Sequence, residues 1–88
     1  MNEKERNILI NEIVSFGFKY KVFKNTISAA ELKKLMIIGL EDFEFIENLI
    51  NTIIVKTRNQ EDLDVERTKN LLLSLEKIRL DLEYSKKC

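Results

Sequence analysis

Residues 28–39, SAAELKKLMIIG, contain the clearest local signature in the chain and decide its predicted fold. Ser28 is followed three residues later by Glu31, which is the spacing of a capping box at the start of a helix. Gly39 is placed to adopt the left-handed backbone conformation that commonly ends a helix. The segment therefore predicts a helix over residues 29–38.

The segment upstream carries an apolar stripe at helical spacing. Intervals of four and three residues alternate along Leu9, Ile13, Phe16, Tyr20, Phe23 and Ile27. This pattern predicts a helix over residues 3–24. A strand over residues 17–23 is the alternative, because Phe18, Tyr20 and Val22 also alternate there with polar residues and glycine. We favour the helix, since a single strand would need a pairing partner.

Two further helices are predicted downstream, over residues 42–57 and 62–85, separated by a polar loop. The last helix has the 4, 3, 4 spacing of a coiled-coil seam, carried by Leu71, Leu75, Ile78 and Leu82. Other leucines lie off this seam, so the helix is apolar over more than one face. We expect the seam to be the self-association surface of a homodimer.

The composition supports the same fold class. The chain has 88 residues, no Pro and only two Gly, whereas an all-β domain would need many turns rich in both. We therefore expect an all-α fold in a single domain, residues 1–88. Its architecture is a compact bundle of about four helices, complete alone or completed by dimerisation.

The formal net charge is zero, but the charges are unevenly distributed. Residues 35–66 contain eight Asp or Glu against two Lys or Arg, while both flanking segments have an excess of cations. The central excess is most concentrated in an acidic edge formed by Glu41, Asp42, Glu44 and Glu47. Either oppositely charged helices lie side by side in one fold, or this edge binds a basic partner such as a DNA-binding protein.

A nucleic-acid interface is the alternative binding function. Its candidate contacts are Lys19, Lys21, Lys24, Lys33 and Lys34, the first three interleaved with aromatic residues. The pI of about 6.3 lacks the basic excess of a dedicated nucleic-acid binder, so we expect nucleic acid to be an improbable partner. The helices on either side of Gly39 also resemble a helix-turn-helix in spacing, but the acidic edge would repel phosphate.

The residues needed for most catalytic and cofactor chemistry are absent from the sequence. There is no His, one Cys and no glycine-rich nucleotide-binding motif, so we expect no enzyme activity and no cofactor. The acidic edge is the one candidate for a divalent cation, and a solvated helix face is the favoured interpretation. We therefore expect no metal site.

The expected function follows from what remains. We expect a small protein-binding regulator or inhibitor that acts by helix-mediated protein–protein interaction, or alternatively a structural or assembly subunit. With Cys88 as the single cysteine, no intramolecular disulfide can form, and no signal sequence or membrane span is visible. The expected location is the cytoplasm.

Overall fold

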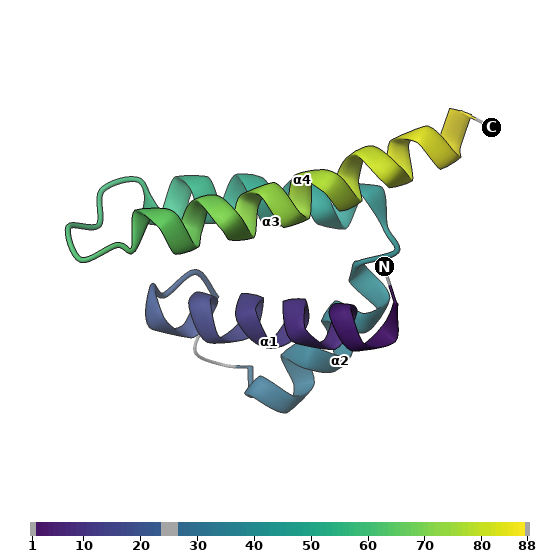
Figure 1. Ribbon diagram of the computed structural model, residues 1–88. Coiled ribbons are helices and arrows are strands. Elements are labelled where there is room, and N and C mark those ends of the chain that lie inside the picture. The colour runs from purple at the N-terminus through teal and green to yellow at the C-terminus, as the bar shows by residue number, and fades with distance from the viewer. Residues whose placement is uncertain (1, 24–26, 88) are drawn as a thin grey trace.

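Every regular element in the part of the chain that the structure describes is an α-helix. The computed structural model describes residues 2–23 and 27–87 (Figure 1). The elements within these residues are α1 (Glu3–Lys19), α2 (Ala29–Gly39), α3 (Phe43–Thr57) and α4 (Val65–Lys87). The predicted all-α class with four helices is therefore confirmed. The strand alternative for residues 17–23 is wrong, because α1 covers the start of that segment and a turn follows it.

Successive helices run in opposite directions and form two pairs (Figure 1). α1 packs against α2, α3 packs against α4, and α1 also contacts α4, which joins the two pairs. The molecule is elongated, with principal extents of 42 × 25 × 21 Å. The last turns of α4 extend beyond the other helices, as the yellow end of the ribbon shows.

The core draws on all four helices. Its fully buried large side chains are Ile13, Phe16, Tyr20, Met36, Ile46, Ile53 and Leu75. Burying a side chain of this size stabilises a fold by about 1.5–3 kcal/mol. The apolar stripe predicted for α1 supplies a large share of this core, and its residues Phe23 and Ile27 pack against the core half-buried.

Each helix begins at a side chain that caps it. The oxygens of Asn2, Ser28 and Asp42 accept hydrogen bonds from backbone N–H groups in the first turns of α1, α2 and α3. The predicted cap at Ser28 is confirmed by a 3.2 Å bond from the N–H of Glu31. The last helix, predicted to start at about residue 62, begins at Val65, because Asp64 caps α4 by accepting from the N–H of Arg67 at 3.0 Å.

The end of α1 differs from the prediction, which extended this helix to residue 24. The helix ends at Lys19, because Lys21 has a φ of 55° and lies in the left-handed region. The N–H of Val22 donates to the carbonyl of Gly17 at 2.8 Å, and the N–H of Lys21 donates to Phe18 at 3.5 Å. These two bonds form a Schellman motif, which terminates a helix and turns the chain back.

The two glycines make room for aromatic rings. A Cβ at Gly17 would clash with the ring of Phe23, and a Cβ at Gly39 would clash with the ring of Phe45. Each ring thus lies six residues after the glycine it packs on. The prediction that Gly39 ends its helix in a left-handed conformation is wrong, since it is the last helical residue of α2 and has no positive φ.

Candidate interaction surface

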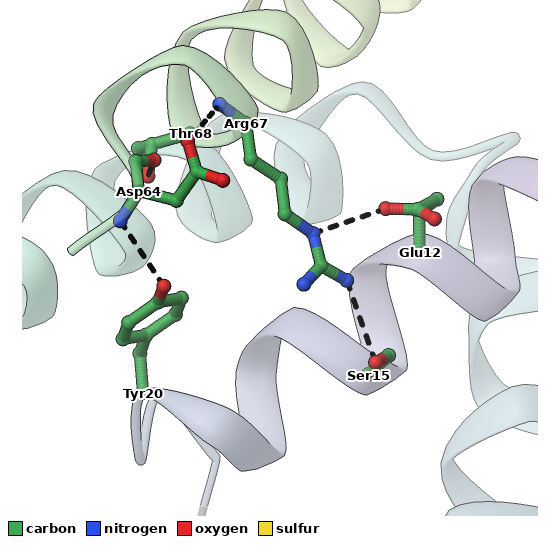
Figure 2. A network of polar contacts seen from close by, with 6 residues as sticks. All are labelled: Glu12, Ser15, Tyr20, Asp64, Arg67 and Thr68. Carbon is green, nitrogen blue, oxygen red and sulfur yellow. Dashed lines mark hydrogen bonds and ion pairs between the residues drawn. The ribbon is translucent and has the colours of Figure 1, made fainter. Parts of the chain in front are cut away.

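A polar network joins α1 to the start of α4 (Figure 2). The Nε of Arg67 donates to a carboxylate oxygen of Glu12 at 3.3 Å, and a terminal nitrogen of Arg67 donates to the hydroxyl of Ser15 at 3.4 Å. The guanidinium also lies 6.0 Å from the centre of the Phe16 ring. Arg67 therefore links α4 to α1 through two hydrogen bonds from its side chain.

The same network includes the loop that precedes α4. The hydroxyl of Tyr20 accepts a hydrogen bond from the N–H of Asp64 at 3.1 Å, and Thr68 donates to the carbonyl of Asp64 at 2.8 Å. The side-chain amide of Gln60 donates to the carbonyl of Tyr20 at 2.8 Å. These contacts hold the end of α1 against the α3–α4 loop. We therefore assign these polar groups a structural role and not a binding or catalytic one.

The structure brings the acidic edge to the turn between α2 and α3 and to the first turns of α3. Asp42 is the cap of α3, with a 2.9 Å bond from the N–H of Glu44. The carboxylate of Glu41 forms an ion pair with Arg6 at 3.2 Å. All four residues are exposed, and within the described residues the carboxylates of Glu44 and Glu47 form neither a cap nor an ion pair. Among residues 2–23 and 27–87, no three potential metal ligands gather in one place.

The candidate nucleic-acid lysines are spread over two helices and a turn. Lys33 and Lys34 are exposed on α2, while Lys19 and Lys21 flank Tyr20 at the end of α1. Lys24 lies outside the described residues. Among the aromatic residues interleaved with these lysines, Tyr20 is only 1% exposed, Phe23 is half-buried and Phe18 is 37% exposed, so Tyr20 offers no open face to a base.

The leucine seam of the last helix faces the core of a single chain. Leu71 and Leu75 are buried there, and Ile78 and Leu82 pack against the core half-buried. The structure thus brings all four predicted residues together on the inner side of α4, where the chain's own core contacts them.

A second apolar face of α4 lies away from that core. Val65, Leu73 and Leu80 are 73%, 58% and 51% exposed. Next to α3, this face forms one wall of an open groove of about 540 Å³, and Ile50 and Ile54 of α3 form the other wall. The sequence contains a signal for this face, because Leu72, Leu73 and Leu80 lie off the predicted seam.

Two charged residues interrupt the apolar lining of the groove. They are Lys69 and Glu76 of α4, and the carboxylate of Glu76 is hydrogen-bonded to Arg79 on the next turn. This hydrogen bond lowers the pKa of Glu76 below its ordinary value and raises the pKa of Arg79. Glu76 is therefore an oriented anion at neutral pH, and Lys69 has no ion-pair partner among the described residues.

Comparisons of the chain with protein-family models, with curated protein sequences and with solved structures found no match. No helix in the described part of the chain has both the length and the apolar character needed to cross a membrane.

Proposed function

We propose that this chain is a small non-catalytic regulator or inhibitor that binds an amphipathic helix in the groove between α3 and α4. The observation that carries the proposal is the second apolar face of α4, where Val65 and Leu73 stand exposed beside Ile54 of α3. Contiguous exposed apolar surface of this kind commonly marks a site of protein interaction.

The shape and chemistry of the groove fit a helix better than they fit a small molecule. It is open along its length and lies between two antiparallel helices, which is the setting of helix-in-groove recognition. Its walls carry few polar groups to orient a small ligand, whereas an amphipathic helix would present apolar residues at three- and four-residue spacing. The absence of His from the sequence supports binding without catalysis.

The other sequence-predicted surfaces receive less support. Asp42 and Glu41 of the acidic edge already serve the fold as a helix cap and as the partner of Arg6. Of the aromatic residues beside the lysines, Tyr20 is buried where base stacking would need it open, and Phe18 packs edge to face against Phe23. The apolar groove is therefore the surface on which we place the interaction.

Quantitative affinity capture with two matched variants tests the proposal. Leu73→Lys places a charge on the groove wall, while Ile38→Lys replaces an apolar residue with Lys at a still more exposed site on α2. We expect proteins captured by the unmodified chain from a lysate of its source cells to be retained by Ile38→Lys and lost by Leu73→Lys. Identical captured sets for all three chains would contradict the proposal.

A further inference from the structure

We infer that the helix bound in the groove is α4 of a second copy of this chain, packed antiparallel about a two-fold axis. The inference rests on the proposed function, because it names the partner of the same groove. The evidence is the order of residues along the exposed face of α4. When the direction of the helix is reversed, its apolar positions match apolar positions and its Lys matches its Glu.

The residues concerned form one stripe along α4. At 100° per residue, six positions between residues 65 and 80 fall within an arc of roughly 100° on the helix surface. They are Val65, Lys69, Leu72, Leu73, Glu76 and Leu80. All but Leu80 line the groove, and Leu80 continues the exposed face toward the C-terminal end of α4.

The stripe is complementary to itself when its direction is reversed. With a two-fold axis at the midpoint between Leu72 and Leu73, these two leucines of one copy face those of the second copy. Val65 then lies beside Leu80 of the second copy, so apolar side chains meet apolar side chains. An interface with this symmetry is isologous, and each of its contacts therefore occurs twice.

The charged positions obey the same symmetry. Lys69 of one copy lies opposite Glu76 of the second, and the two-fold axis generates the reciprocal pair. A parallel, in-register arrangement would instead place Lys69 beside Lys69 and Glu76 beside Glu76, which is repulsive. Charge complementarity thus selects the antiparallel orientation, as charges at helix interfaces commonly do.

Lys69 has no ion-pair partner among the described residues, and Glu76 keeps free acceptor positions beside its two contacts with Arg79. Lys69 and Glu76 are two helical turns apart, about 10.5 Å along the axis, and form no ion pair with each other. Arg79 holds the carboxylate of Glu76 on the same helix. Since a carboxylate has about four acceptor positions, Glu76 can accept from Arg79 and from Lys69 of the second copy together.

This interface is distinct from the leucine seam predicted for self-association. The seam residues Leu71 and Leu75 lie on the core side of α4, roughly a third of a turn from the stripe. The dimer would therefore bury apolar surface that the folded chain leaves exposed, without opening the core of either copy.

Variants that exchange the charges of Lys69 and Glu76 test whether these residues pair across the two-fold axis. By sedimentation equilibrium of the full chain from about 1 to 200 μM, we expect a monomer–dimer equilibrium. Lys69→Glu and Glu76→Lys should each weaken the dimer by at least about tenfold, because each creates two like-charge pairs. The double variant should dimerise more tightly than either single variant, since the pairs across the axis return with reversed sign, but it should stay weaker than the unmodified chain because it loses the contact between Glu76 and Arg79.

Lys77→Glu is the matched control for charge. It makes the same change at an exposed position of α4 outside the stripe, and it should leave dimerisation unchanged. Circular dichroism of every variant verifies that the helices are retained, so that lost association is separated from lost folding.

Distances between spin labels test the orientation. With Cys88→Ser as background, labels at Asn70→Cys and Ser85→Cys report on exposed positions of α4. In the antiparallel dimer the two labels at position 85 lie about 37 Å apart along the axis, whereas those at position 70 lie about 7 Å apart. In a parallel dimer both axial separations would be near zero, and that result would overturn the inference.

The remaining outcomes are also decisive. A chain that stays monomeric at 200 μM, or a dimer that Lys69→Glu does not weaken, overturns the inference. Neither outcome overturns the proposed function, because selective loss of a captured protein by Leu73→Lys would still identify the groove as a site for another partner.

Discussion

The hydroxyl oxygen of Tyr20 accepts a hydrogen bond from the backbone N–H of Asp64, 44 positions further along the chain. The Tyr20 ring is buried where α1 ends, and Asp64 is the residue that caps α4. One side chain therefore links the last turn of the first helix to the first turn of the last. This link sets where α4 begins and how it lies on α1.

Replacing Tyr20 with Phe tests the energetic value of this link. The ring and its packing are kept, but the N–H of Asp64 loses its partner, which should lower the free energy of unfolding by about 1 kcal/mol. Urea denaturation at constant pH measures the change. Tyr84→Phe removes the same hydroxyl from a ring that is 75% exposed and should be neutral, so equal effects of the two changes would argue against the role of the buried hydroxyl.

A second prediction concerns the contact between Gly17 and Phe23. Gly→Ala inside a helix normally stabilises by roughly 1 kcal/mol. Here we expect Gly17→Ala to destabilise, because the new Cβ would displace the Phe23 ring from its place against α1. In a chain that already carries Phe23→Ala the clash is absent, and the same Gly17→Ala should then stabilise.

The sign of the coupling free energy between positions 17 and 23 decides this prediction. Thermal unfolding of the two single variants and the double variant gives the coupling between the sites. If Gly17→Ala stabilised the unmodified chain and the Phe23→Ala chain equally, the packing of the Phe23 ring would not require a glycine at position 17.

A third prediction separates the charge of Asp42 from its hydrogen bonds. Asp42 was predicted as part of an acidic edge, and the structure uses it as the cap of α3. Asp42→Ala should cost about 1 kcal/mol, whereas Asp42→Asn should cost only a few tenths, because Asn caps a helix nearly as well. Thermal unfolding at low ionic strength compares the two, and an equal loss in both would instead assign the effect to charge.

The sequence predicts the helices better than it predicts their ends. The apolar stripes and the capping box at Ser28 identify all four helices, because amphipathic periodicity and local side-chain bonds are properties of neighbouring residues. The end of α1 was missed because a lysine, Lys21, adopts the left-handed conformation that usually signals glycine. The prediction for Gly39 failed for the opposite reason. This glycine has no positive φ, and it is needed because a Cβ there would clash with the Phe45 ring.

The candidate interaction surface was only partly predictable. The surplus of leucines on the last helix shows that it has two apolar faces, but spacing alone does not say which face enters the core. The more regular stripe, with Leu71 and Leu75, packs inside the chain. The less regular one, with Leu73 and Leu80, stays exposed. This assignment depends on how α4 docks against α1 and α3, which is a tertiary property.

The assignment of these two faces gives the last prediction. Leu73 and Leu75 lie two residues apart on α4, yet Leu75 is completely buried and Leu73 is 58% exposed. Leu75→Ala should lower the free energy of unfolding by about 2–4 kcal/mol, because it leaves a cavity in the core. Leu73→Ala should change it by less than about 0.5 kcal/mol when urea denaturation is measured on dilute, monomeric protein.

The same pair of variants separates stability from association. At higher protein concentration, a second copy that binds the groove stabilises the unmodified chain by mass action, and Leu73→Ala should lose that gain. The difference between the unmodified chain and Leu73→Ala should therefore grow with concentration, while Leu75→Ala stays impaired at every concentration. A large loss of stability from Leu73→Ala in dilute solution would place Leu73 in the core and remove the apolar face from which the groove function is argued.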